Sequence, residues 1–326
     1  MANDIFVLVE HLQGKVSETT YELLGKGREL AAAAGGTLMA VLLGSGAKGL
    51  ASELGAADKV LLVDHASLES YTPEAYRRAL GALARERGPR LVLVASTAVG
   101  MDQAAGLSAE LGWPLVAYAK DVTLAGGALT AVSQIYGGKI LAESQIHGDH
   151  AIVSALPGSF PADAGRVAGS PALEEVPPPA LDGLRMRFAR LIQPEAGDVD
   201  ITREPLLVSV GRGIGSQDNI SVVEELAEAL GAALSASRPI VDQGWLPKTR
   251  QVGKSGMTVK PKLYLAVGIS GAPEHLEGMR GAETIVAINT DLAAPIFGVA
   301  HYGVGADLFD VLPALTEKIK AARGQA

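Results

Sequence analysis

A glycine-rich turn lies where an expected strand passes into an expected helix. The apolar run Leu206–Val210 is followed by Gly-Arg-Gly-Ile-Gly at 211–215, and Ser216 or Asp218 could cap the next helix. Glycines let backbone N–H groups approach a ligand, and a helix N-terminus carries partial positive charge, so the turn could seat a phosphate. The spacing is not that of the dinucleotide fingerprint, and such a turn serves equally often as a purely structural device.

A second candidate is the stretch 243–262, which carries basic side chains and no acidic ones in a protein of formal net charge −8. Its partner is either a bound anion or an acidic patch of this protein or a neighbour. Within it, Gly253-Lys254-Ser255-Gly256 places a cation and a hydroxyl between glycines, which suits a pyrophosphate or a polar ring edge. It is not a Walker A loop, because the four-residue spacer after the first glycine is absent. The basic residues are Lys248, Arg250, Lys254, Lys260 and Lys262.

Several classes of chemistry are excluded by composition. The chain has no cysteine, which rules out disulfides, thiolate zinc sites, cysteine nucleophiles and cysteine-ligated iron–sulfur clusters. Any redox chemistry must therefore use an organic cofactor. His147 and His150 lie in a polar turn without a third ligand, so we expect no metal site. The acidic balance argues against a nucleic-acid partner.

The ends and the apolar runs indicate a protein free in an aqueous compartment. Met1 to Asp4 precede only the short run Ile5–Val9, which lacks the charged region and long apolar core of a signal peptide. No apolar run approaches the roughly 18 residues of a membrane span. We expect a cytoplasmic protein with no membrane insertion.

The elements that must position these groups alternate along the chain. In the first half, apolar runs at 5–9, 38–43, 60–63 and 91–95 read as buried strands, with helices expected at 21–34, 73–86 and 101–111. Each helix ends near a glycine: Gly35, Gly88 and Gly112. This rhythm predicts right-handed crossovers and a parallel sheet. Shorter strands at 121–124, 128–133, 139–144 and 151–155, joined by glycine turns, suggest an antiparallel extension.

A change of texture divides the chain into two expected domains. Residues 158–179 lose periodicity and end in Pro177-Pro178-Pro179, which favours an extended spacer. A second alternating block follows, with strands at 206–210, 263–267 and 284–288 and helices at 219–230 and 308–322. We therefore predict an α/β protein of two doubly wound, mostly parallel-sheet domains, 1–190 and 191–326, joined by a Pro/Gly-rich linker.

The C-terminal half carries a series of blocks whose order and spacing resemble the FAD domain of electron-transfer flavoprotein alpha subunits. The resemblance covers most of residues 205–320 and is looser in the first half, where it rests on Tyr136-Gly137-Gly138 and the following 139–144. The blocks are 236–242 (ASRPIVD), 251–256 (QVGKSG), 263–272 (LYLAVGISGA), 275–276 (HL), 285–289 (IVAIN) and 302–308 (YGVGADL).

Carried onto this sequence, the resemblance assigns roles to individual residues. It implies that Arg238 lies beside the isoalloxazine ring, that Ser255 offers its hydroxyl to the flavin N5/O4 edge, and that His275 binds the C2 carbonyl side. These groups would favour the anionic, one-electron-reduced ring. The full implied FAD-binding set, running from the ring through the phosphates to the adenosine end, is Arg212, Ser237, Arg238, Val252, Gly253, Lys254, Ser255, Ser270, Gly271, Ala272, Pro273, Glu274, His275, Asn289, Asp307 and Leu308.

Plainer interpretations of the same residues stay open at this point. Arg238 could form a surface ion pair with Asp242, His275 could be an exposed residue at a helix start, and Asn289 and Asp307 could cap turns or helices.

Two residues depart from the family pattern. Lys254 and Glu274 stand where many members of the family carry glutamine. We expect Lys254 to raise the flavin potential and Glu274 to favour a protonated His275.

The resemblance also implies partners and a mode of action. The chain would be an electron carrier and not an enzyme, of the kind that serves fatty acid β-oxidation. It would form a heterodimer with a beta subunit that commonly binds AMP, and the FAD domain would swivel on the base that the first domain and the beta subunit form. Flavin dehydrogenases would be the donors and a quinone oxidoreductase or similar protein the acceptor. A bifurcating variant with a second flavin in the beta subunit remains open.

Two alternatives come from other classes of function. A nicotinamide-dependent dehydrogenase would use the 211–215 turn, but no acidic residue closes a second strand at the fingerprint spacing and no His/Asp or Tyr/Lys pair lies nearby. A nucleotide-binding regulatory module without redox activity is the other. Both would give a colourless protein, whereas a flavoprotein would be yellow.

Overall fold

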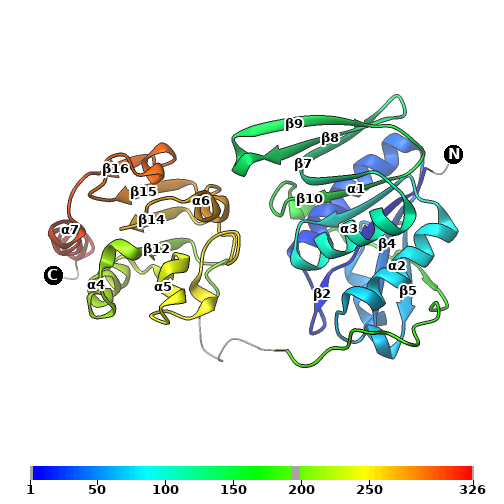
Figure 1. Ribbon diagram of the computed structural model, residues 1–326, viewed down its shortest axis with the longest axis horizontal. Helices are drawn as coiled ribbons and strands as arrows, with labels where there is room; N and C mark the ends of the chain where they lie inside the picture. Colours follow the sequence, from blue (N-terminus) through cyan, green and yellow to red (C-terminus); the bar gives the residue numbers. More distant parts are fainter. Residues whose placement is uncertain (1–2, 192–198, 325–326) are drawn as a thin grey trace. The chain divides into compact units, whose positions relative to one another are not determined.

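The computed structural model describes residues 3–191 and 199–324. It divides into two compact units, residues 1–190 and 191–326, each with its own sheet and core (Figure 1). Within the described residues, no helix is both long and apolar enough to span a bilayer.

Unit 1 is built on a nine-stranded sheet in the order β11-β5-β4-β1-β6-β10-β7-β8-β9. The strands from β11 to β7 pair in parallel, and β7, β8 and β9 extend the sheet in antiparallel fashion. A small hairpin of β2 (His11–Leu12) and β3 (Lys15–Val16) follows β1. The sheet strands are β1 (Ile5–Leu8), β4 (Leu38–Gly44), β5 (Lys59–Asp64), β6 (Leu91–Ala95), β7 (Leu115–Ala125), β8 (Ala128–Ile135), β9 (Ile140–Ile146), β10 (Ala151–Ala155) and β11 (Ala172–Glu175).

Three helices cover the two faces of this sheet (Figure 1). They are α1 (Glu18–Ala34), α2 (Pro73–Arg87) and α3 (Ala98–Leu111). Ser17 and Thr97 cap α1 and α3 by accepting backbone N–H groups of the first turn, which helix starts leave without partners. The three helices end at Gly35, Gly88 and Gly112, all in the left-handed conformation that glycine adopts without strain.

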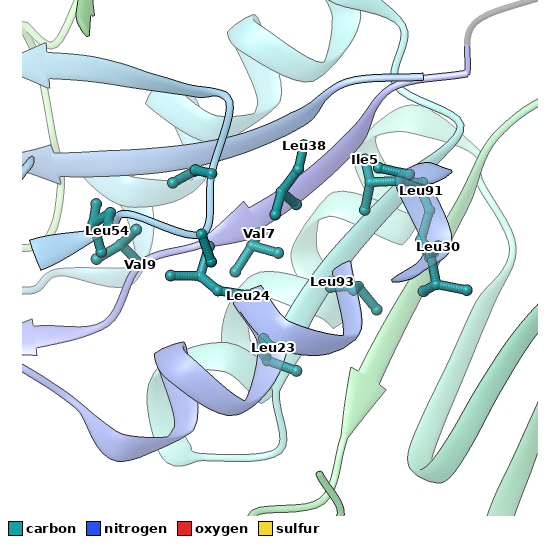
Figure 2. Close-up of a cluster of buried hydrophobic side chains, with 14 of the residues drawn as sticks. Ile5, Val7, Val9, Leu23, Leu24, Leu30, Leu38, Leu54, Leu91 and Leu93 are labelled. Carbon is teal, nitrogen blue, oxygen red and sulfur yellow. The ribbon is translucent and has the colours of Figure 1, made fainter. Parts of the chain in front are cut away.

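The apolar periodicity of α1 explains how one face of the sheet is buried. Leu23, Leu24 and Leu30 of α1 belong to one buried cluster with side chains of the sheet, and Figure 2 shows Leu24 beside Val7 and Leu30 beside Leu91. The opposite face is covered by α2 and α3. Fully burying one leucine contributes about 1.5–3 kcal/mol, so both layers stabilise the unit.

The Pro/Gly-rich segment differs from the spacer that the sequence predicts. Residues 172–175 form β11 and pair with β5, and Val176 and Leu181 are buried in the core of unit 1. The carboxylate of Glu74 then accepts hydrogen bonds from the backbone N–H groups of Arg185 (2.7 Å) and Met186 (3.2 Å). These hydrogen bonds lower the pKa of Glu74. The chain is therefore attached to unit 1 as far as residue 186.

Unit 2 holds a five-stranded, fully parallel sheet in the order β13-β12-β14-β15-β16. Helices α4 and α7 pack against each other on one face, and α6 covers the other face. The strands are β12 (Leu206–Val210), β13 (Ala233–Ala236), β14 (Leu263–Val267), β15 (Thr284–Ile288) and β16 (Tyr302–Val304), and the helices are α4 (Ile220–Leu230), α5 (Arg238–Asp242), α6 (Pro273–Met279) and α7 (Leu308–Ala322).

The predicted α/β class is confirmed, including the parallel sheets and the antiparallel extension of the first one. The sequence reading was wrong about the length of β7, which begins at Leu115 instead of residue 121. It also missed β2, β3, β11, β13, β16, α5 and α6, which are two to seven residues long and too short to show a period.

Glu10, which directly follows the buried run at the end of β1, provides a test of the core of unit 1. Burial raises its pKa to about 7, although its Oε1 accepts a hydrogen bond from the Thr97 hydroxyl at 2.7 Å. A carboxyl with a raised folded-state pKa stabilises the fold while it is protonated, and that stabilisation is lost as pH rises from about 4.5 through 7. The free energy of unfolding of Glu10→Gln, measured by urea unfolding, should therefore exceed that of the wild type by roughly 1–3 kcal/mol at pH 8. The difference should disappear near pH 4.5. Glu69→Gln, at an exposed site, is the control, and an equal effect of Glu10→Gln at both pH values would contradict the burial argument.

Candidate functional site

A cavity of about 900 Å³ opens at the carboxyl ends of the parallel strands of unit 2. Ligands of open α/β sheets bind at this edge, and the volume lies at the upper end of the range for small-molecule sites. Its walls come from the turns after β12, β13, β14 and β15, from the loop at 251–255 and from the start of α6. The lining residues are Arg212, Gly213, Ser237, Arg238, Pro239, Asp242, Gln251, Val252, Gly253, Lys254, Ser255, Gly268, Ile269, Ser270, Gly271, Ala272, Glu274, His275, Asn289 and Asp291.

The floor of the cavity depends on a close approach of two backbone turns. The backbone N–H groups of Gly211 and Gly213 donate to the carbonyls of Val267 (2.8 Å) and Gly268 (3.0 Å). A Cβ atom on Gly211 would lie 2.4 Å from the Gly268 oxygen, and one on Gly213 would lie 2.8 Å from the Gly268 Cα. Only glycine permits this contact. The 211–215 turn thus has the structural role that the sequence left open, and it also borders the cavity.

The loop at 251–257 is held against both the sheet and α6. Val252 N–H donates to the Ala236 carbonyl at 2.9 Å, and Lys254 N–H donates to the Glu274 carbonyl at 2.7 Å. Gly253 has φ +129°, and a Cβ there would lie 2.8 Å from that same Glu274 oxygen. The Gln251 side chain donates to the Ser255 hydroxyl at 2.9 Å, which orients Ser255 at the cavity wall.

The cationic groups of the cavity differ in their surroundings. Arg238 pairs with Asp242 through Nε at 3.2 Å, and both side chains are exposed, so the surface ion pair that the sequence allowed is present. Lys254 lies 4.0 Å from Glu277. Lys248 and Arg250, in contrast, donate to the Gln251 side chain and the Leu234 carbonyl. Of the basic stretch 243–262, Lys254 therefore lines the cavity, whereas Lys248 and Arg250 support the loop.

His275 is buried, with 6% of its surface exposed, and the plainer interpretation of an exposed histidine is wrong. Its Nε2 lies 2.9 Å from the hydroxyl of Tyr264, which is fully buried. Burial lowers the pKa of His275 to about 4, and the backbone of Val252 opposes this shift without overcoming it. The expectation that Glu274 keeps His275 protonated is therefore wrong, because desolvation outweighs the exposed carboxylate, and the imidazole is neutral at pH 7.

The structure brings together most of the site residues that the sequence singled out. Thirteen of the sixteen line the cavity. Pro273, Asp307 and Leu308 do not: Pro273 begins α6, Asp307 caps α7 by accepting the Phe309 N–H at 2.9 Å, and Leu308 packs in the core. Asn289 both lines the cavity and caps a turn, since its Oδ1 accepts the Asp291 N–H at 2.9 Å.

The implied FAD-binding set omits seven lining residues, of which Gly213 had been singled out only as part of the 211–215 turn: Gly213, Pro239, Asp242, Gln251, Gly268, Ile269 and Asp291. Most of them stand beside residues that were named, so proximity along the chain was the available signal. Tyr264 was missed as well, because a tyrosine inside an apolar strand reads as core.

Comparison with known proteins gives consistent matches over nearly the whole chain. The profile of the electron transfer flavoprotein domain matches residues 5–181, and that of the electron transfer flavoprotein FAD-binding domain matches residues 200–280. The chain is 38% identical to the electron transfer flavoprotein subunit alpha of Mycobacterium leprae (98% of this chain, 99% of the relative) and 35% identical to that of Bacillus subtilis (98% of each). It is 36% identical to protein FixB of Clostridium saccharobutylicum (97% and 96%).

The backbone at Gly253 provides a test of the loop geometry. Gly253→Ala would combine an unfavourable positive φ with a collision against the Glu274 carbonyl, so we expect a loss of about 1–3 kcal/mol in the stability of unit 2. Urea unfolding would measure it. Gly298→Ala is the matched control, because a Cβ there meets nothing within 4 Å. Equal stability of the two variants would contradict the assigned loop conformation.

Proposed function

The chain belongs to the electron transfer flavoprotein alpha-subunit family, and from this premise we propose that the cavity of unit 2 holds FAD and that the chain transfers electrons between partner proteins. The observation that carries the proposal is the convergence of cations, hydroxyls, glycine backbone and a buried histidine on one cavity at the carboxyl edge of the sheet. The match of residues 200–280 to the FAD-binding domain supports the choice of cofactor.

The residues present fit a dinucleotide with a flat ring. FAD needs backbone donors and cations for its phosphates and close backbone approach for its ring. The glycines let the turns at the cavity pack closely, because a side chain at Gly211, Gly213 or Gly271 would collide with neighbouring backbone. His275 supplies a buried ring nitrogen, Nδ1, which makes no hydrogen bond among the described residues.

Arg238, Ser255 and His275 are the groups that tune the cofactor. When bound, FAD supplies a ring that takes up and releases single electrons. Arg238 and Lys254 contribute positive charge at the cavity, and the Ser255 hydroxyl contributes a donor held in place by Gln251. His275 contributes a donor without charge, because it is neutral. Together these groups stabilise the negative charge that reduction adds.

The remaining residues of the proposed set hold the rest of the dinucleotide. Ser270 and Gly271 serve the phosphates. Asn289, Asp307 and Leu308 serve the adenosine end; of these, Asn289 lines the described cavity. Arg212, Ser237, Val252, Gly253, Ala272, Pro273 and Glu274 complete the set.

The chain acts with partner proteins. An alpha subunit implies a beta subunit, so the functional unit is a heterodimer in which residues 1–190 pack on the beta chain, and AMP is the nucleotide expected there. Flavin dehydrogenases donate electrons, and a quinone oxidoreductase accepts them, in the cytoplasm. The carrier makes and breaks no substrate bonds, and whether it bifurcates electrons depends on the beta chain.

Co-expression with the beta chain tests this function. The purified complex should be yellow and release one FAD per heterodimer, with AMP as the second nucleotide. Two FAD per heterodimer would identify the bifurcating type. A colourless complex that binds no added FAD would refute the proposal and favour a nucleotide-binding protein without redox activity.

The charge of Arg238 should contribute to cofactor affinity. In Arg238→Gln the cavity loses a cation at the ring, and we expect the Kd for FAD to rise about ten-fold, the size of one charge-assisted hydrogen bond. Fluorescence titration of the cofactor-free complex measures it. Arg203→Gln is the control, because Arg203 also forms an exposed ion pair, with Asp200, and does not line the cavity. An unchanged Kd in Arg238→Gln would contradict this role.

The charge of Lys254 should set the potential. Lys254→Gln removes a cation at the cavity and should lower the first-electron potential, because negative charge on the ring is then less well stabilised. Redox titration of the yellow complex measures the change. Lys262→Gln, whose side chain is exposed outside the cavity lining, should leave the potential unchanged. Equal potentials in wild type and Lys254→Gln would count against tuning by this charge.

A further inference from the structure

A buried polar row crosses the sheet of unit 2 beneath α6. Ser209 and Ser235 are paired neighbours on β12 and β13, and Ser209 pairs with Ala266 on its other side. Both serines are fully buried, and their hydroxyls have no hydrogen-bond partner at ordinary geometry among the described residues. Tyr264 lies on the same face, one same-face step before Ala266. Hydroxyl groups in such a core cost free energy unless they satisfy one another.

The register of the sheet places both serines on the same face as Tyr264, so its hydroxyl is a polar group that they can reach. Burial raises the pKa of Tyr264, and the hydroxyls of Ser209 and Ser235 pull it in the opposite direction, as donors near the phenolic oxygen do. That oxygen can accept from both serines. Its own proton then has an acceptor at 2.9 Å, Nε2 of His275. In this arrangement every hydroxyl proton of the row is directed to a partner.

The other nitrogen of His275 supports the same orientation. Nδ1 is buried and has no hydrogen-bond partner among the described residues, and His275 lines the cavity. A neutral imidazole with its proton on Nδ1 accepts from Tyr264 at Nε2 and keeps an N–H available for a ligand in the cavity.

We propose that Tyr264 is a positioning residue: its hydroxyl, supported by Ser209 and Ser235, donates to Nε2 of His275 and fixes the neutral ring with its proton on Nδ1 at the wall of the cavity. The inference deepens the proposed function and rests on it, since the ring so fixed is one of the groups that face FAD. Tyr264 does not line the cavity and acts through His275.

The arrangement has a specific consequence for the cofactor site. A histidine free to exchange tautomers could present either a donor or a lone pair at the cavity, and only the donor stabilises added negative charge. Tyr264 removes this choice. It also ties α6 to the central strand β14, because His275 stands in the first turn of α6. The orientation of the His275 imidazole is thus set by a side chain of the sheet, Tyr264 of β14.

The tautomer is measurable directly in the full chain. With ¹⁵N-histidine in this chain of the heterodimer, long-range ¹H–¹⁵N correlation should show Nδ1 of His275 protonated and Nε2 bare at pH 7, with His275→Gln identifying the signals. In Tyr264→Phe the pattern should shift toward a mixture of tautomers. Tyr302→Phe, at an exposed tyrosine of the same unit, is the control and should change nothing. A protonated Nε2 in the wild type, or an unchanged pattern in Tyr264→Phe, overturns the proposal.

Two further measurements separate this proposal from a general packing effect and from the proposed function. Tyr264→Phe should raise the Kd for FAD about five-fold, the size of one net hydrogen bond, and lower the first-electron potential. If Tyr264→Phe does not fold, the double variant Ser209→Ala, Ser235→Ala keeps the Tyr264 side chain and should still shift His275 toward a mixture of tautomers. An unchanged tautomer in that variant overturns the proposal. A heterodimer that binds no FAD refutes the proposed function, while the tautomer measured in it still tests the role of Tyr264.

Discussion

The unit 2 cavity depends on one backbone contact, the approach of the turn at 211–213 to Gly268. Two backbone hydrogen bonds of 2.8 and 3.0 Å join the ends of β12 and β14 there. Gly211 and Gly213 have no side chain to collide with Gly268, so the turns after these two strands pack directly against each other. The space above the turns remains open for a ligand. The loop at 251–257 and the first turn of α6 then close around that space.

The electrostatic character of the site follows from how deeply each titratable side chain is buried. The cations that line the cavity, Arg212, Arg238 and Lys254, are exposed to solvent, where an ammonium or guanidinium keeps its charge at low cost. The deepest titratable group facing the cavity is His275, and burial keeps it uncharged. The site therefore combines solvated charges at its rim with neutral, oriented donors below. Such an arrangement favours an anionic ring without burying an unpaired charge.

The sequence predicted the long elements well because their signals are local. The period of α7 and the glycine after α1 are read along a single segment, and the structure places both as expected. The site residues were also within reach, since cations and glycines cluster along 237–256. Contacts between segments could not be predicted from the sequence. The Tyr264–His275 hydrogen bond joins a strand to a helix, and β11 forms by pairing with β5 at the edge of the sheet. The charge state of His275 was misjudged for the same reason: the prediction rested on the adjacent Glu274, whereas the burial of His275 in the folded unit sets its pKa.

The attachment of residues 172–186 to unit 1 shortens the segment that connects the two units. The last described anchor is the pair of hydrogen bonds from Arg185 and Met186 to Glu74, and the first residue buried in the core of unit 2 is Ile201. The covalent path between them is residues 187–200, which fully extended would measure at most roughly 50 Å. The triple proline contributes nothing to that length. Pro177–Pro179 therefore belong to unit 1, and the length of the connection is set by the residues that follow the anchor at Glu74.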